Sequence, residues 1–386
     1  MDGYFLDICF ITVSSALFAW CACRFRQPIL LGYFLCGVLL GPWGFGLIQH
    51  TELLEHISHI GITLLLFLAG LVLHPECLAK YFRTAITVTI SGCILSSVVV
   101  FGSLCAFGYP PVESFIASLA LMFSSTILAI KLLPTTTLHQ KRMGGICIAI
   151  LIAQDIIAVV LIMIVGFTAE ETLWKFVLLL IAKALLLIAV TAGVERYVLR
   201  KMMQSSEQFN EVLLILCLGW CLGIAALAEY VGLSYEIGAF IAGVLMARGK
   251  ISLILSEQLK PLRDFFLMFF FFVLGAEFNL FLAKTVWAPA LLLSVLIVTI
   301  RPVYMQRLLC IMGEEKGFAG EISFRLGQAS EFALIVAVTA SKSGRLSDTV
   351  SQLIQLTTIL TMIASSYIVV FRFPTPIGTN RKLKRD

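Results

Sequence analysis

Residues 31–40 read Leu-Gly-Tyr-Phe-Leu-Cys-Gly-Val-Leu-Leu, and residues 237–246 read Ile-Gly-Ala-Phe-Ile-Ala-Gly-Val-Leu-Met. The two stretches are 206 residues apart, and five of their ten positions are identical. The correspondence continues at an offset of 205, where Ser125 matches Ser330. The chain therefore contains two related halves.

The composition is typical of a protein embedded in a membrane. Hydrophobic residues make up 60% of the chain and charged residues only 13%, which is more apolar surface than a soluble protein of this length can cover. Glycine and proline interrupt the apolar sequence, and thirteen segments between these breaks are long enough to cross a bilayer. They lie at about 4–23, 28–47, 56–74, 84–107, 113–133, 143–167, 172–194, 209–230, 233–247, 262–282, 286–310, 319–340 and 349–371.

The step in spans from one related stretch to the other decides their relative orientation. The first stretch lies in span 2 and the second in span 9; this step is odd, so the second copy is inverted with respect to the membrane. We expect an all-α membrane protein in which spans 1–6 (residues 1–171) and spans 8–13 (residues 201–373) form two inverted repeats. Span 7 (residues 172–200) links them, and residues 374–386 form a short basic tail. Inverted repeats are typical of secondary transporters, whose halves meet at a site near the bilayer midplane.

Basic residues are unequally divided between the two sides of the predicted bundle. Most Lys and Arg residues fall in the odd-numbered connections, and the first of these contains Arg24 and Arg26. Basic residues concentrate on the cytoplasmic side, which places the N-terminus outside and the C-terminus in the cytoplasm, with the plasma (inner) membrane as the expected location. The formal net charge of +5 is therefore a topology signal, and we expect no nucleic-acid partner. The tail is expected to contact anionic lipid headgroups through Arg381, Lys382, Lys384 and Arg385.

The sequence offers no pattern of an enzyme or of a metal centre. Its eleven cysteines lie mostly inside predicted spans, at spacings that provide no zinc ligand set. We expect them to be small apolar filler. No nucleophile–base pair can be read from the chain. We therefore expect no enzymatic activity and no cofactor.

Spans 5 and 12 have polar centres. Span 5 contains the three consecutive hydroxyls Ser124-Ser125-Thr126, and span 12 contains Gly327-Gln328-Ala329-Ser330-Glu331. Hydroxyl groups compete for backbone hydrogen bonds, and irregular backbone at membrane depth is tolerated only inside protein or beside water. We predict that both spans are broken there and cross each other, so that half-helix dipoles converge on one place. The alternative is two ordinary helices with satisfied side chains.

Asp155 is the candidate carrier of the transported ions. It lies at the centre of span 6 in an otherwise apolar segment, where a lone carboxylate costs about 2.5–3.5 kcal/mol. A proton, a bound cation or a partner charge would offset that cost, and a carboxylate that alternates between a proton and a cation is the simplest exchanger. The neighbouring Gln154 has two interpretations, because its carbonyl oxygen can ligate a cation or accept a hydrogen bond that packs the helices.

Other charged residues also occur at membrane depth. Arg301 in span 11 precedes Pro302; we expect Glu331 or a half-helix carbonyl as its lasting partner, with Asp155 competing for it. Glu331 is interpreted as the counterion that keeps the crossing neutral. Lys183 in span 7 has no partner that the sequence identifies, and Arg325 is expected to extend toward the cytoplasmic surface.

At these residues the sequence resembles the monovalent cation:proton antiporter-2 family, and in particular its Kef-type branch. The resemblance covers essentially the whole chain. It is carried by the glycine-containing stretches at 32–41 and 232–245, by Ser124-Ser125-Thr126, by Gln154-Asp155, and by residues 327–332, Gly-Gln-Ala-Ser-Glu-Phe. Each piece is weak alone, but the combination is specific.

The resemblance implies a homodimer with two domains in each protomer. Spans 1–3 and 8–10 would form a dimer-forming scaffold, and spans 4–6 and 11–13 would form a core that moves against it like an elevator. Asp155 would match the cation- and proton-binding aspartate of the family, and Arg301 the basic residue that faces it. Ser125 and Thr126 would match the polar groups of the unwound crossing, which join Asp155 and Gln154 around the transported cation.

The sequence also departs from this family pattern. Electrogenic relatives carry two adjacent acids where this chain has Gln154-Asp155, which favours electroneutral exchange of one proton for one cation. Val72 and His74 stand where Kef-type proteins often have acids. The fifteen residues after 371 are too few for a nucleotide-binding domain, so regulation of the Kef type would need a separate regulatory subunit.

The leading prediction is antiport of K+ or Na+ against H+. The alternatives are a K+ efflux channel without obligatory proton coupling, a symporter of an anionic solute on a similar fold, and a membrane sensor that does not transport. The sequence does not choose between K+ and Na+, because that selectivity depends on small differences in cavity geometry.

Overall fold

The structure is a computed structural model that describes residues 3–25, 27, 29–48, 52–71, 75–132, 142–165, 173–206, 208–247 and 250–375. Within these ranges the chain is helical and contains no strand. Val72, His74 and the basic cluster of the tail at 381–385 lie outside the described residues.

The helices overlap the predicted spans, although α4 begins at residue 75 rather than about 84 and α13 at residue 250 rather than about 262. They are α1 (Gly3–Arg24), α2 (Ile29–Leu40), α3 (Glu52–Leu71), α4 (Pro75–Ala106), α5 (Pro111–Ala120), α6 (Thr126–Leu132), α8 (Arg142–Val165), α9 (Leu173–Val194), η1 (Glu195–Leu199), α10 (Arg200–Ser205), α11 (Asn210–Val231), α12 (Tyr235–Met246), α13 (Lys250–Ala276), α14 (Leu280–Ile311), α15 (Lys316–Arg325), α16 (Glu331–Lys342) and α17 (Asp348–Arg372). Spans 5 and 12 are each divided between two helices, α5–α6 and α15–α16.

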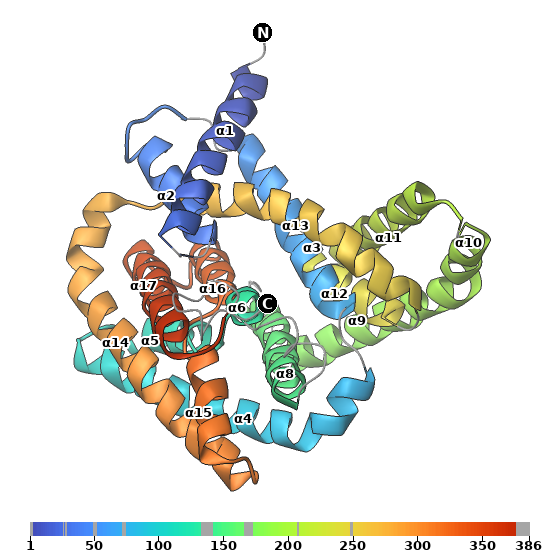
Figure 1. Cartoon of the computed structure of the whole chain (residues 1–386). Helices are drawn as coiled ribbons and strands as arrows, with labels where there is room; N and C mark the ends of the chain where they lie inside the picture. Colours follow the sequence, from blue (N-terminus) through green and yellow to red (C-terminus); the bar gives the residue numbers. More distant parts are fainter. Residues whose placement is uncertain are drawn as a thin grey trace.

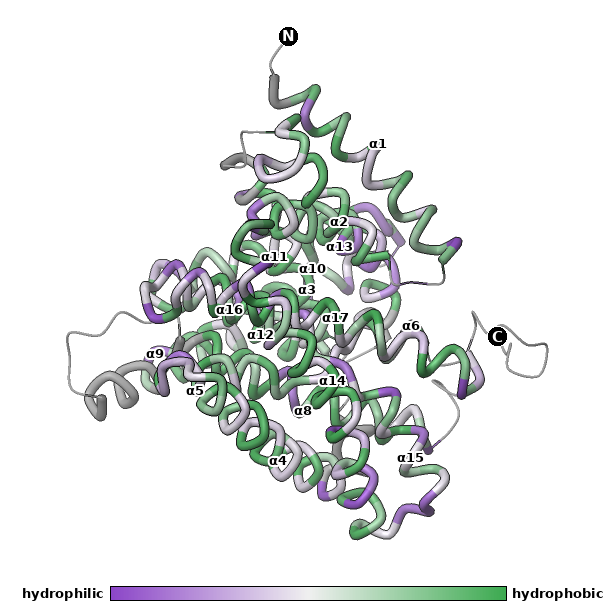
Figure 2. The backbone as a smooth tube through the Cα atoms, turned by 90° about the vertical axis from the view of Figure 1, so that its left-hand side faces the viewer, coloured by the Kyte–Doolittle hydropathy of each residue, from purple (hydrophilic) through white to green (hydrophobic). Residues whose placement is uncertain are grey.

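The helices have the length and hydropathy of an integral multi-pass membrane protein. Among the described residues, six are long and apolar enough to cross a membrane, at 5–24, 83–106, 142–162, 210–231, 280–311 and 348–372. Four shorter apolar helices lie at 29–40, 56–71, 111–120 and 235–246. Figure 2 shows the hydrophobic colour along most of the chain, with hydrophilic residues gathered near helix ends such as that of α15.

Two groups of helices pack mainly among themselves (Figure 1). In the first group α3 packs on both α12 and α13, α2 packs on α13 and α1, and α11 packs on α12. In the second group α14 packs on α4, α15 and α17, while α4 packs on α5 and α8 and α16 packs on α17. The broken helices α5–α6 and α15–α16 both lie in the second group, which places the polar centres of spans 5 and 12 in one body of the protein.

The first group is held together by equivalent glycines from the two halves of the sequence. A Cβ atom on Gly37 of α2 would collide with the carbonyl oxygen of Phe272 in α13, and a Cβ atom on Gly243 of α12 would collide with the carbonyl oxygen of Phe67 in α3. Gly243 is the counterpart of Gly37 at an offset of 206, and Phe272 is the counterpart of Phe67 at an offset of 205. Helix α2 of the first half therefore packs on the backbone of α13 in the second half, and α12 of the second half packs on the backbone of α3 in the first half.

The same relationship holds in the opposite direction. Gly275 of α13 lies against the carbonyl of Phe34, and its counterpart Gly70 lies against the carbonyl of Phe240. Only glycine permits backbones to approach this closely, and small residues at helix interfaces serve this purpose in membrane proteins. The sequence repeat is therefore also a repeat of contacts in the fold.

Candidate cation-binding site

Both polar spans are broken where the sequence predicts. Helix α5 ends at Ala120 and α6 begins at Thr126, while α15 ends at Arg325 and α16 begins at Glu331. The two breaks contact each other, because the Ser124 hydroxyl donates a hydrogen bond of 2.8 Å to the carbonyl of Leu326. The predicted interruption of both helices at one junction is confirmed.

Equivalent serines start the second half of each broken helix. The Ser125 hydroxyl oxygen accepts a hydrogen bond from the Leu128 backbone N–H at 3.1 Å. The Ser330 hydroxyl oxygen accepts one from the Phe332 backbone N–H at 3.2 Å. Serine is among the best residues at a helix N-cap because its oxygen satisfies a backbone N–H that lacks an intrahelical partner. Ser125 thus has a structural role at the junction in addition to its predicted place near the cation.

The guanidinium of Arg301 binds equivalent carbonyl groups of the two breaks. Its Nη1 donates to the carbonyls of Phe123, at 3.0 Å, and Gln328, at 2.8 Å, and these two residues correspond at the offset of 205. Its Nη2 donates to the carbonyl of Leu121 and, at 3.0 Å, to the hydroxyl of Ser96. Ser96 is itself the counterpart of Arg301 in the first half of the chain.

These contacts define what Arg301 does in this conformation. The side chain is only 3% exposed, and among the described residues its hydrogen-bond partners are carbonyls and one hydroxyl rather than a carboxylate. Of the partners expected for Arg301, the structure therefore shows the half-helix carbonyl and not an ion pair with Glu331 or Asp155. The positive charge stabilises the carbonyl groups that have no intrahelical hydrogen-bond partner where the helices break.

Asp155 lies beside the junction on α8. The side chain is 4% exposed, and the Thr126 hydroxyl donates to its Oδ1 at 3.1 Å, with Oδ2 at 3.4 Å. No ion pair involves Asp155 in the part of the chain that the structure describes. A buried carboxylate with one neutral donor is poorly compensated, so a proton or a cation is needed to neutralise it.

Glu331 adds a second carboxyl group to this region. It is 1% exposed and is the first residue of α16, where the positive end of the helix dipole favours a negative charge. It lies close enough to Asp155 for the two carboxyl groups to interact electrostatically. Two nearby carboxylates disfavour the doubly charged state, which strengthens the need for a proton or cation at the junction.

Gln154 supports the break in the neighbouring helix. Its Oε1 accepts a hydrogen bond of 2.9 Å from the backbone N–H of Ser124. In the second half the equivalent N–H, that of Ala329, donates to the hydroxyl oxygen of Thr361 at 3.0 Å. Of the two interpretations of Gln154, the structure shows the hydrogen bond that packs the helices. The amide oxygen has a second lone pair, so a cation could share it.

From the sequence, Gln328 was identified only as part of the polar centre of span 12, and Ser365 and Ser96 were not identified. Gln328 accepts a hydrogen bond from the Ser365 hydroxyl at 2.9 Å through its Oε1, and its Nε2 donates to the carbonyl of Ser125 at 3.4 Å. Ser96 was missed as well, although its position opposite Arg301 follows from the repeat offset of 205. Alignment of the two halves residue by residue would have identified Ser96.

Two further charged residues are placed by the structure. Arg325 was expected to extend toward the cytoplasmic surface, and this prediction was wrong. Its side chain is 1% exposed and donates at 2.7 Å to the carbonyl of Leu132, to the carbonyl of Pro374 and to Glu321 Oε1. Lys183 is partly buried, and its Nζ lies 3.0 Å from where a Cβ atom of Gly232 would be. Lys183 therefore lies close to the turn that precedes α12.

Comparisons with known proteins agree with this architecture. A family model described as "Sodium/hydrogen exchanger, transmembrane" matches residues 12–372. The glutathione-regulated potassium-efflux system protein KefC of Escherichia coli O81 (strain ED1a) is 32% identical over 375 residues, which cover 92% of this chain and 58% of KefC. KefC of Shigella sonnei (strain Ss046) gives the same values. The chain thus spans 58% of the length of these relatives.

Solved structures show the same fold at low sequence identity. The sodium proton antiporter MjNhaP1 from Methanocaldococcus jannaschii at pH 8 superposes with a TM-score of 0.73 at 16% identity, over 94% of this chain and 96% of that one. An electron-microscopy structure of MjNhaP1 gives a TM-score of 0.68. The fold, the junction of broken helices and the family match agree with the resemblance identified from the sequence. The chain belongs to the sodium/hydrogen exchanger transmembrane family, a family of monovalent cation/proton antiporters and not of enzymes, and is a homologue of KefC.

Proposed function

We propose that this protein exchanges K+ or Na+ for H+ across the membrane, with Asp155 as the group that carries either the proton or the cation. The observation that carries the proposal is the environment of Asp155. It is buried at a junction of broken helices, accepts a hydrogen bond from Thr126, and forms no ion pair in the described part of the chain.

The proposed exchange follows from competition for one carboxyl group. A cation binds the charged carboxylate, with oxygens of Thr126, Ser125 and Gln154 as the other candidate ligands, and hard monovalent cations prefer oxygen ligands. A proton makes Asp155 neutral and removes the charge that holds the cation. Because residue 154 is glutamine, the α8 pair supplies one titrating group, which supports electroneutral exchange. Arg301 donates hydrogen bonds to the carbonyl groups of the crossing. Glu331 is the counterion of that crossing.

The arrangement of helices supports an elevator mechanism within two inverted repeats. The reciprocal contacts of Gly37 with Phe272 and of Gly243 with Phe67 are those expected if spans 1–6 and 8–13 are equivalent units. We propose that all thirteen predicted segments cross the membrane, with the N-terminus outside. Spans 1–3 and 8–10 form the scaffold of a homodimer, and spans 4–6 and 11–13 form the moving core. The plasma membrane is the proposed location, and a separate regulatory subunit is a proposed partner.

The test is proton flux in proteoliposomes that contain the purified protein. Imposed gradients of Li+, Na+, K+ and Rb+ should each be tried with the wild type and with Asp155→Asn. We expect at least one cation to drive proton movement in the wild type and no movement in the variant. Asp155→Glu is the matched control, because it keeps the carboxyl group. Full proton flux in Asp155→Asn would reject Asp155 as the carrier.

A second candidate is K+ efflux without obligatory proton movement. It is favoured by the relatives named as potassium-efflux systems, which are 32% identical to this chain. A membrane potential should then drive K+ flux in the proteoliposomes while the internal pH stays constant. Antiport predicts the opposite result, namely that K+ flux and pH change occur together.

A further inference from the structure

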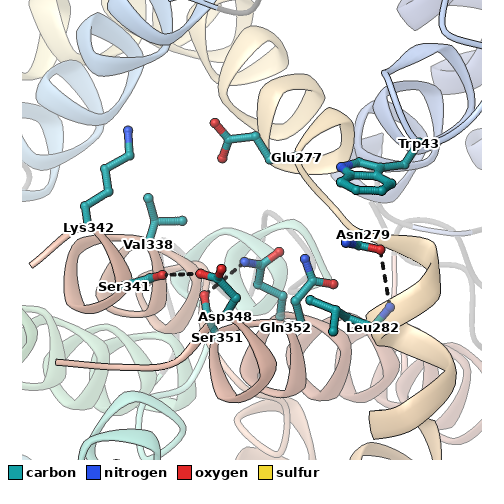
Figure 3. A pocket seen from close by; sticks show the side chains of 11 residues that line it. Trp43, Glu277, Asn279, Leu282, Val338, Ser341, Lys342, Asp348, Ser351 and Gln352 are labelled. Carbon is teal, nitrogen blue, oxygen red and sulfur yellow. Dashed lines mark hydrogen bonds between the residues drawn. The ribbon is translucent and has the colours of Figure 1, made fainter. Parts of the chain in front are cut away.

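A cavity lies away from Asp155, between the two groups of helices. Its volume is about 290 Å³. One wall comes from Trp43 after α2, from Glu277 after α13 and from Asn279 before α14, and the opposite wall comes from α16 and α17 (Figure 3). Asp155, Thr126 and Ser125 do not line it. With the N-terminus outside, these loops face the external solution, so the cavity is an external vestibule.

The α17 wall of the vestibule contains buried oxygen atoms without hydrogen-bond donors. Gln352 and Gln355 are 6% and 7% exposed and both line the cavity. The Oε1 atom of each has no hydrogen-bond partner among the described residues, although the Gln355 Nε2 donates to the Ser351 hydroxyl at 3.3 Å. Buried carbonyl oxygens in native proteins are almost always paired. Two such oxygens beside one cavity are available as acceptors for a water molecule or a cation from solution.

The charges around the vestibule favour a positive ligand. The acidic side chains that line it are Glu277 and Asp348, and the basic one is Lys342, so the acidic groups outnumber the basic one. The Ser341 hydroxyl donates to Asp348 Oδ1 at 2.9 Å, which holds that carboxylate in place. Figure 3 shows Glu277 on the side opposite Asp348 and Gln352. Carboxylate and amide oxygens together form a ligand set for hard cations and their bound waters.

We propose that the vestibule is a second, external cation site that stabilises the position of the core seen in this structure. This inference rests on the elevator mechanism proposed above. Glu277 directly follows the scaffold helix α13, whereas Gln352 and Gln355 belong to α17 of the core. A cation held between the two walls would have to leave before the core could move, because movement separates its ligands. Binding of the external cation therefore favours one state, as a ligand with different affinities for two states must.

The experiment separates this site from Asp155 by removing Asp155. The variant Asp155→Asn in lipid nanodiscs would be titrated with NaCl and KCl against choline chloride at constant ionic strength, and the thermal unfolding midpoint recorded. We expect a saturable increase of the midpoint with Na+ or K+. Adding Glu277→Gln should weaken the apparent affinity at least tenfold, and Gln352→Leu should weaken it as well. Adding Lys342→Gln should strengthen it, since this change removes the opposing positive charge.

Opposite shifts for Glu277→Gln and Lys342→Gln would not result from a general loss of folding. The inference is overturned if Asp155→Asn shows no response to Na+ or K+ beyond that to choline, or if the Glu277 and Lys342 variants leave the response unchanged. If the wild type shows antiport but the midpoint of Asp155→Asn does not respond to Na+ or K+, the vestibule site alone is overturned. If the midpoint of Asp155→Asn does respond but the wild type shows no antiport, the proposed function alone is overturned.

Discussion

Phe123 and Gln328 are 205 positions apart and present their main-chain carbonyls to the same nitrogen atom, Nη1 of Arg301, at 3.0 and 2.8 Å. They occupy the same position in the two halves of the chain. The Nη1 atom of Arg301 therefore lies between equivalent carbonyl groups of the two halves. The junction is therefore built around one guanidinium that donates hydrogen bonds to both broken helices.

Replacement of Arg301 by alanine should destabilise the junction. Three carbonyls and the Ser96 hydroxyl would lose their donor, and a buried group left without its partner costs about 1–3 kcal/mol. We expect a loss of at least about 3 kcal/mol and a lower thermal midpoint in detergent. Arg301→Lys should be intermediate, because an ammonium cannot reproduce the planar geometry. An unchanged midpoint in Arg301→Ala would contradict the role given to these hydrogen bonds.

The donor to Asp155 can be removed with little change in shape. Thr126→Val deletes the hydroxyl that contacts Asp155 at 3.1 Å, and Thr126→Ser keeps it. A hydrogen bond to a charged group contributes about 1.5–3 kcal/mol, so the apparent cation affinity should fall about tenfold or more in Thr126→Val. The measurement is the half-saturating cation concentration for proton flux. Thr126→Ser should remain close to the wild type, and equal effects of the two changes would exclude this hydroxyl.

Competition at Asp155 predicts a specific dependence on pH. If one proton and one cation exclude each other, the half-saturating cation concentration should rise about tenfold for each unit by which the pH falls, once the site is mostly protonated. This rise is measured by proton flux at a series of pH values with equal pH on both sides of the membrane. A half-saturating concentration independent of pH would exclude a shared site.

The glycine contacts between the halves give a structural prediction with an internal control. Gly243→Ala should destabilise the protein because its Cβ would collide with the backbone of Phe67, and overpacking typically costs about 1–3 kcal/mol. The control is Gly219→Ala in α11, where a Cβ would meet no atom within 4 Å. There the substitution should be neutral or stabilising by up to about 1 kcal/mol, because alanine is the better helix former. Similar thermal midpoints for the two variants would contradict the close approach.

The sequence was sufficient for features that depend on local composition. Three hydroxyls in a row at Ser124-Ser125-Thr126 cannot be accommodated easily in an apolar helix, so the break in span 5 was predictable from the residues alone. The repeat was predictable because close packing of helix backbones requires glycine at both Gly37 and Gly243. The break depends on three consecutive residues, and the repeat is visible because a short pattern recurs about 206 residues later in the chain.

The partners of Arg301 and Arg325 were less predictable, because they are carbonyl groups and every residue has one. Only the three-dimensional arrangement selects Phe123 and Gln328 for Arg301, or Leu132 and Pro374 for Arg325. The expectation that Arg325 extends toward water failed for this reason: depth along a helix does not show whether a neighbouring backbone supplies acceptors. Gln352 and Gln355 also look ordinary within α17 until the cavity beside them is seen.

Two residues at equivalent positions of nearly symmetrical halves can still differ for a structural reason, as Ser96 and Arg301 do. Arg301 Nη2 lies 3.0 Å from the hydroxyl of Ser96, the residue at its own equivalent position. A second arginine at 96 would have to reach the same carbonyls through space that the first already fills. One arginine therefore serves both breaks, and the small serine at position 96 leaves room for its guanidinium and accepts one of its hydrogen bonds.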